Sequence, residues 1–177
     1  MLSRRAFLAA TASGLGTAAL RPRHSQAADR TAEIRSPVNG PIGLQLWSLR
    51  ESLPKDLAGT LAKVRSLGFR EVEGAGLWKH TASELRTALD ANGLVCRSTH
   101  LGYERLRDDA PGAFAEAKTM GASAIVCPWI PHEGAFTRDD ALKAAAAFNG
   151  FGRAAREAGL RFGYHCHGYE FVPSAEG

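Results

Sequence analysis

The apolar positions of the chain follow a repeated order: a helical stretch, a glycine and a short strand-like run. This order occurs four times, in "SLGFREVEG", "ANGLVCRSTH", "TMGASAIVCP" and "EAGLRFGYH". A glycine directly after a helix supplies the left-handed backbone conformation that closes it. A further apolar run, Ile42–Leu49, has no helix before it and is expected to form the first strand. The four closing glycines are Gly68, Gly93, Gly121 and Gly159.

The helices carry their own start signals. Asp56 is placed to cap one helix, and the capping box "TASE" beginning at Thr81 starts the next. Thr137 starts a long last helix, and a shorter helix is expected around Phe114, before Gly121. The long helix contains the pair Gly150 and Gly152, which weaken it by about 1 kcal/mol each relative to alanine. We therefore expect this helix to bend or break at the pair.

Short apolar strands that alternate with helices predict an α/β fold with a parallel sheet. Five strands and four helices are expected, a count that fits a doubly wound sheet or part of a (β/α)8 TIM barrel. The segment after the first strand, "LWSLRESLP", contains no glycine. It therefore lacks the phosphate-binding loop of a dinucleotide-binding sheet.

The amino terminus has the features of an export signal. Arg4 and Arg5 precede the apolar run 6–20, which is too short for a spanning helix of about 20 residues. "SRRAFL" looks like a twin-arginine signal, with small residues before a cleavage site at Ala27. We expect an export signal in residues 1–27, a periplasmic location, and no stable membrane anchoring after cleavage. A basic amphipathic helix is the alternative for this segment.

The net charge and the cysteines limit which ligands and partners are expected. The net charge of +4 is carried entirely by residues 1–27, which leaves 18 basic and 18 acidic residues in the remainder. A neutral mature chain has no bulk electrostatic attraction for nucleic acid, so no nucleic-acid partner is expected. The three cysteines, Cys96, Cys127 and Cys166, match no zinc-binding spacing, and we expect buried thiols.

Polar and aromatic residues gather where the predicted strands end. In both candidate architectures functional residues lie at the carboxyl ends of the strands, so these side chains should meet. Aromatic faces together with titratable tips suit a polyhydroxylated ligand. We expect only one of Glu71 and Glu73 to face inward, and Glu73 lies nearer the strand end. The candidates are Trp47, Glu73, His100, Trp129, His165, His167 and Glu170.

The histidines separate into two groups. His165 and His167 are two apart, so on a strand they face the same way and form a candidate metal or general-base pair. Glu170 would join them if the strand ends near His167. His80 and His132 are expected to be solvent-exposed loop residues.

Four stretches, "IGLQLWSLR", "GFREVEGAG", "GLVCRSTHLGYERL" and "GLRFGYHCHGYEF", together resemble the sugar phosphate isomerase/epimerase family of xylose isomerase-like TIM barrels. The resemblance covers residues 41–173. It implies a (β/α)8 barrel that binds Mn, Mg, Co or Zn and moves a proton next to a sugar carbonyl through an enediolate.

Residue by residue, the resemblance places His165 or His167 at the position of a metal ligand, and we expect His167 and Glu170 to bind the metal. It implies Glu170 and His100 as catalytic groups. From their places at the strand ends, Trp47, Glu73, Trp129 and His165 are expected to line the substrate pocket. The sequence departs from the family pattern in having histidine where the best-known epimerases have a metal-binding glutamate, and Cys166 where asparagine is common.

Other functions fit the same barrel. A lyase or hydrolase of 3-keto glycosides and a non-catalytic carbohydrate-binding barrel are the alternatives to a sugar isomerase or epimerase. A complete barrel needs about 250 residues, so residues 42–177 are expected to form about five strand–helix units of a truncated barrel, which would then be inactive by itself. A sugar or sugar derivative is the expected ligand, and a homo-oligomer is left open.

Overall fold

The computed structural model describes residues 35–36 and 40–173. The predicted export signal, residues 1–27, and most of the predicted leader, residues 28–41, lie outside the described residues. Within the leader, the two short strands β1 (Arg35–Ser36) and β2 (Gly40–Pro41) pair antiparallel. No helix of the described part is long and apolar enough to cross a membrane.

Five strands form one parallel sheet, in the order in which they occur along the chain. A doubly wound sheet reverses its strand order at a switch point, whereas this order is that of successive strand–helix units in a barrel. The prediction of about five strand–helix units of a (β/α)8 barrel is therefore confirmed. The strands are β3 (Gly43–Gln45), β4 (Glu71–Gly74), β5 (Val95–His100), β6 (Ala124–Cys127) and β7 (Arg161–Tyr164).

The predicted helix starts are present. The Asp56 carboxylate accepts a hydrogen bond from the N–H of Gly59 and caps α2 (Leu57–Ser66). Capping boxes at Thr81 and Thr137 start α3 (Ala82–Ala91) and α6 (Arg138–Glu157). Each such cap stabilises its helix by about 1 kcal/mol. The four predicted closing glycines all have positive φ.

Two parts of the helical prediction differ from the structure. The segment between β5 and β6 contains two helices, α4 (Tyr103–Asp108) and α5 (Ala110–Thr119), where one was expected. Asp109 ends the first and caps the second with its carboxylate, which separates them. The helix α6 runs unbroken through Gly150 and Gly152, so the expected break is absent. The helix propensity lost at the two glycines is small compared with the stabilisation that a long helix gains from tertiary packing.

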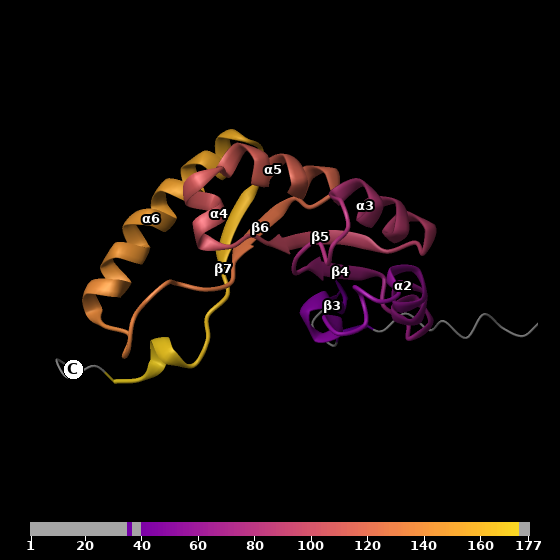
Figure 1. Ribbon diagram of the computed structural model, residues 1–177, viewed down its shortest axis with the longest axis horizontal. Coiled ribbons are helices and arrows are strands. Elements are labelled where there is room, and N and C mark those ends of the chain that lie inside the picture. Colours follow the sequence, from indigo (N-terminus) through magenta and orange to yellow (C-terminus); the bar gives the residue numbers. More distant parts are fainter. Residues whose placement is uncertain (1–34, 37–39, 174–177) are drawn as a thin grey trace, which may run out of the picture. The chain divides into compact units, whose positions relative to one another are not determined.

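The two faces of the sheet carry different residues. Val72, Cys96, Thr99, Ile125 and Cys127 are almost completely buried between the sheet and the helices. Figure 1 shows α3, α5 and α6 lying along this outer side of the strands. Leucines from the helices and from the turn before α2 complete the core, and each fully buried leucine stabilises the fold by about 1.5–3 kcal/mol. Those with no exposed surface are Leu46, Leu53, Leu61 and Leu85.

The opposite face carries the polar residues. Glu71 and Glu73 both lie half-buried on it, while Val72 between them faces the helices. The expectation that only one of the two acids faces inward is wrong, because side chains two residues apart on a strand point to the same side. Glu71 pairs with Arg97 at 2.7 Å, which leaves Glu73, nearer the strand end, for the site.

A β-bulge sets which residues of β5 share this face. Val72 lies opposite Cys96, but the next residue, Glu73, lies opposite Ser98 rather than Arg97. One residue of β5 is therefore skipped, and the inward and outward positions exchange beyond it. As a result Ser98 and His100 face the same side as Glu73.

Candidate functional site

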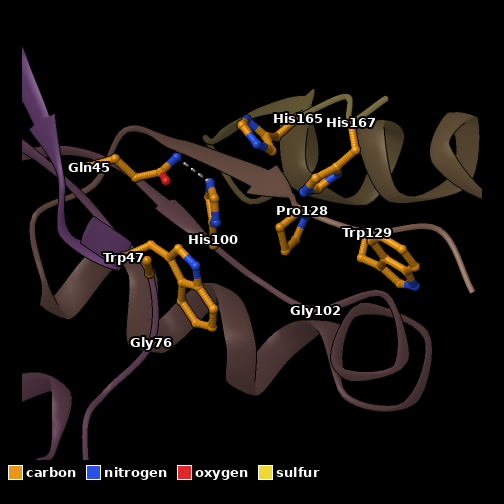
Figure 2. Close-up of a pocket in the computed structure, with 10 residues that line it drawn as sticks. Gln45, Trp47, Gly76, His100, Gly102, Pro128, Trp129, His165 and His167 are labelled. Atoms are coloured by element: carbon orange, nitrogen blue, oxygen red, sulfur yellow. Dashed lines mark hydrogen bonds between the residues drawn. The ribbon is translucent and has the colours of Figure 1, made fainter. Parts of the chain in front are cut away.

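A pocket of about 400 Å³ lies at the carboxyl ends of the strands (Figure 2). This volume is within the range of about 300–1,000 Å³ that is typical of small-molecule sites. The predicted residues Trp47, His100, Trp129, His165 and His167 meet there, although they come from four different strand–helix units. The pocket is lined by Gln45, Trp47, Ala75, Gly76, His100, Gly102, Pro128, Trp129, His165 and His167.

A hydrogen-bonded pair, Glu73 and His100, stands at the centre of the site. Nε2 of His100 lies 2.9 Å from Oε1 of Glu73. The Gln45 amide donates to the same Oε1 at 2.8 Å, and the hydroxyl of Ser98 donates to Oε2. These four side chains come from the neighbouring strands β3, β4 and β5. Parallel pairing in register brings them together at one level of the sheet.

The three donors keep Glu73 ionised. The hydrogen bond from His100 contributes most, and the bonds from Ser98 and Gln45 act in the same direction against the effect of burial. Together they lower the pKa of Glu73 from 4.5 to about 2. At neutral pH the site therefore contains a fixed negative charge directly behind the imidazole of His100.

This charge determines which ring nitrogen of His100 carries the proton. An ionised carboxylate can only accept hydrogen bonds, so Nε2 of His100 is the protonated nitrogen of the neutral ring. The amide nitrogen of Gln45 also lies 3.3 Å from this Nε2. The Nδ1 atom makes no hydrogen bond within residues 40–173 and is not sealed from solvent. In the neutral ring Nδ1 is therefore the nitrogen with the free lone pair, and the ring lines the pocket.

Two tryptophans form the walls of the pocket. In Figure 2 Trp47 lies next to His100, and Trp129 lies on the other side of Pro128. About half of each residue is exposed, 52% for Trp47 and 47% for Trp129, so neither belongs to the buried core. Trp47 lies in the 3-10 helix η1 (Leu46–Leu49), which directly follows β3. Its ring packs against that of Trp78, with 5.9 Å between the ring centroids.

The wall beside Trp47 contains a strained turn. Trp78 and Lys79 have φ angles of 53° and 69°, a region that side-chain-bearing residues rarely adopt. Two such residues in succession follow Gly76, which lines the pocket. Strain of this kind concentrates at functional sites, because the surrounding structure must hold it in place.

His165 and His167 follow β7 rather than lying within it. The strand ends at Tyr164, and the N–H of His165 makes a last ladder bond to the carbonyl of Cys127. Both imidazoles still line the pocket, with 4.8 Å between their ring centroids. The His165 ring lies 5.5 Å from that of His100, so three imidazoles border one space.

Glu170 lies away from this group. It sits in the 3-10 helix η2 (Tyr169–Phe171), and it does not line the pocket. Its two carboxylate oxygens accept the N–H of His167 at 3.0 and 2.9 Å, and Oε1 also accepts the hydroxyl of Tyr164. Burial opposes ionisation, but these hydrogen bonds lower the pKa of Glu170.

The expected metal site, with His167 and Glu170 as ligands, is not assembled by the described residues. Residues 35–36 and 40–173 contain no group of three or more histidine, cysteine, aspartate or glutamate side chains arranged to hold a metal ion. The carboxylate nearest the imidazoles, Glu73, is already used by its three donors. The roles of His167 and Glu170 in binding a metal remain predictions.

Three residues lie in surroundings other than those expected. His132 is half-buried among aromatic rings, stacked on Trp129 at 5.2 Å, and is not a solvated loop residue. His80 is half-buried too, and its Nε2 is enclosed without a partner among the described residues. Cys96 and Cys127 are buried as expected, but Cys166 is exposed because the chain has left the sheet before it.

Sequence reasoning missed Gln45 and Ser98 as parts of the site. A signal for both exists: each is a polar residue within a strand, and Ser98 precedes His100 by two, which places it on the same face. Tyr169 was also missed. Its hydroxyl accepts the N–H of Ile130, and its ring packs on Trp129 at 4.6 Å.

No protein-family profile and no curated protein matches the sequence. Solved structures do match. A sugar phosphate isomerase/epimerase from Parabacteroides distasonis superposes with a TM-score of 0.64 at 24% identity, over 80% of this chain and 57% of that one. A xylose isomerase domain containing protein from Salmonella typhimurium gives a TM-score of 0.52 at 12% identity, over 69% of this chain and 47% of the other.

This chain has the fold of the xylose isomerase-like TIM barrels. An AP endonuclease of family 2 from Brucella melitensis shares that fold, with a TM-score of 0.51 at 12% identity over 62% of this chain and 49% of its own. The chain spans 57% and 58% of the two Parabacteroides distasonis structures with TM-scores of 0.64. At these identities the xylose isomerase-like barrel is established as a fold, and the activity has to be argued from the site.

Proposed function

We propose that this chain forms the pocket of a sugar isomerase or epimerase-like enzyme, in which His100 moves a proton on a bound sugar. The observation that carries the proposal is the Glu73–His100 pair: an ionised carboxylate holds Nε2 of a ring that lines the pocket, which leaves Nδ1 as the nitrogen that can accept a proton. Paired aromatic walls next to this base suit the C–H faces of a sugar ring.

The reaction follows from the chemistry of these groups. A sugar carbonyl weakens the neighbouring C–H bond, and Nδ1 of His100 accepts the proton while the electron pair moves to the carbonyl oxygen. The imidazolium that results is stabilised by the Glu73 carboxylate. In isomerisation the hydroxyl proton of the same carbon moves to the former carbonyl oxygen, that hydroxyl becomes the new carbonyl, and His100 returns its proton to the former carbonyl carbon. In epimerisation water donates a proton to the other face of the same carbon, the carbonyl forms again, and His100 releases its proton to solvent. His165 and His167 are placed to donate hydrogen bonds to the developing oxyanion.

Among the described residues no group of three or more metal-binding side chains is assembled. A divalent ion, where bound, would supply charge neutralisation at the enediolate oxygen. The residues of this pocket that would hold such an ion are His165 and His167, whose imidazoles both line it.

The test is deuterium exchange. The whole chain is incubated in D₂O with D-fructose, D-xylose or a 3-keto glucoside, and loss of the C–H signal next to the carbonyl is followed by ¹H NMR. His100→Asn should reduce exchange by about 100-fold or more, and Glu73→Gln should reduce it as well. Glu71→Gln, on the same strand but outside the pocket, should leave exchange unchanged.

The outcomes separate the candidate functions. Release of the aglycone from the 3-keto glucoside, without exchange into the free ketose, would assign a lyase or hydrolase instead. Sugar binding seen by saturation-transfer NMR without any exchange would assign a carbohydrate-binding barrel. If none of the three sugars binds or exchanges, the proposed function is wrong.

A further inference from the structure

Two irregular segments form one wall of the pocket, and something must hold them in place. Trp129 belongs to the segment between β6 and α6, and His167 to the segment after β7. Both side chains are exposed, and neither segment is part of the sheet. A ligand that binds between such walls gains affinity only if the walls are already in position.

A chain of hydrogen bonds links the two segments. The N–H of Ile130 donates to the hydroxyl oxygen of Tyr169 at 3.1 Å, and the hydroxyls of Tyr169 and Tyr164 lie 2.9 Å apart. The hydroxyl of Tyr164 bonds to Glu170, whose oxygens also bond to the N–H of His167. The chain thus runs from the backbone beside Trp129 to the backbone of His167.

Counting protons fixes the direction of every bond in this chain. The ionised carboxylate of Glu170 can only accept, so Tyr164 donates its single hydroxyl proton to it. Tyr164 then has no proton left for Tyr169, so Tyr169 donates to Tyr164. The Tyr169 oxygen in turn accepts from the N–H of Ile130. All three side chains are satisfied in this arrangement, and reversing one bond would leave a donor facing a donor.

The same tyrosine orders the aromatic rings of the wall. The ring of Tyr169 packs at 4.6 Å on Trp129, at 4.5 Å on His132 and, stacked, at 5.9 Å on His167. The hydrogen bonds fix where its hydroxyl lies, and the ring contacts transmit that position to the side chains facing the pocket.

We propose that Tyr164, Tyr169 and Glu170 are positioning residues that lock Trp129 and His167 into one wall of the pocket. This assignment replaces the expected role of Glu170 as a base or metal ligand. It rests on the proposed function only in that the wall is taken to face a sugar.

The test uses the whole chain labelled with 5-fluorotryptophan, which gives one ¹⁹F resonance for each of the three tryptophans. Tyr164→Phe, Tyr169→Phe and Glu170→Gln should each shift and broaden the resonance of Trp129. The Trp78 resonance should not move, which shows that the variant is folded. Tyr103→Phe is the matched control: it removes the remaining tyrosine hydroxyl, which lies outside the chain of hydrogen bonds, and should leave Trp129 unchanged.

Sugar affinity gives a second readout. Each of the three variants should weaken binding of whichever sugar the wild type binds by about three- to tenfold, the effect of one lost hydrogen bond. If the wild type binds no sugar, the proposed function fails, while the fluorine spectra still decide the positioning role.

Two results would overturn the assignment. In the first, the Tyr164→Phe spectrum is the same as that of Tyr103→Phe at Trp129. Tyr164→Phe removes only a hydroxyl, so it decides the matter even where Tyr169→Phe fails to fold. In the second, added Mn²⁺ broadens the Trp129 resonance of the wild type but not that of Glu170→Gln, which would make Glu170 a metal ligand.

Discussion

Replacement of Glu73 by glutamine should make the stability of the chain less dependent on pH. The carboxyl has a pKa of about 2 in the folded chain, against 4.5 for the free group. Each unit of difference is worth about 1.4 kcal/mol, so ionised Glu73 contributes about 3 kcal/mol to the free energy of unfolding. Because the folded pKa is the lower one, this contribution is complete above about pH 5 and is lost as the pH falls towards 2.

The measurement compares two proteins across that window. Urea unfolding of the wild type and of Glu73→Gln is followed by tryptophan fluorescence at pH 6, 5, 4 and 3. Groups that do not contact Glu73 titrate equally in both proteins and cancel in the difference between them. The two should converge by about 2 kcal/mol between pH 6 and pH 3, the part of the contribution lost in that range.

The control variant is Glu133→Gln. It removes a carboxylate from an exposed loop, where no hydrogen bond to a described residue is formed. It should change the free energy of unfolding by less than about 0.5 kcal/mol at each pH. If the difference between wild type and Glu73→Gln is the same at pH 3 as at pH 6, the three donors do not hold this carboxylate as described.

Further predictions concern the framework of the site. Thr81→Ala removes the oxygen that caps α3 and should lower the free energy of unfolding by about 1 kcal/mol in urea, whereas Thr81→Ser should cost less; equal losses would contradict the capping role. Gly74→Ala places a Cβ 2.6 Å from a threonine hydroxyl on the neighbouring strand, and should cost about 1–3 kcal/mol in the same assay; a neutral effect would mean that the strands separate easily. Cys166 should react with Ellman's reagent in the folded chain while Cys96 and Cys127, whose thiol pKa values burial raises, react only in denaturant; three fast-reacting thiols would contradict the burial of two of them.

The fold could be predicted because its signals are local. A capping residue such as Thr81 and a closing glycine such as Gly93 act within one turn of their own helix, and apolar runs mark the strands between them. Parallel order then follows, since strands separated by helices cannot pair as hairpins. The continuity of α6 could not be predicted, because packing against the sheet outweighs the local cost of its glycines.

The candidate site could be predicted only in part. The rule that the carboxyl ends of parallel strands lie at one edge of the sheet was enough to predict that His100, His165 and Trp129 meet. It was not enough to find the pairing of Glu73 with His100, which are 27 residues apart and meet only through strand register. Glu170 illustrates the opposite case, because the local turn after β7 directs its carboxylate back to the backbone of His167.

The skipped residue in β5 has a consequence for engineering and for sequence comparison. Arg97 is the extra residue, so deleting it would restore a regular ladder and leave Ser98 opposite Glu73 and Thr99 opposite Gly74. The imidazole of His100 would therefore keep its side of the sheet, whereas inserting or deleting one residue between Ser98 and His100 would turn it towards the helices. An ungapped alignment with a relative that lacks the extra residue would compare residues on opposite faces of the sheet from Ser98 onwards.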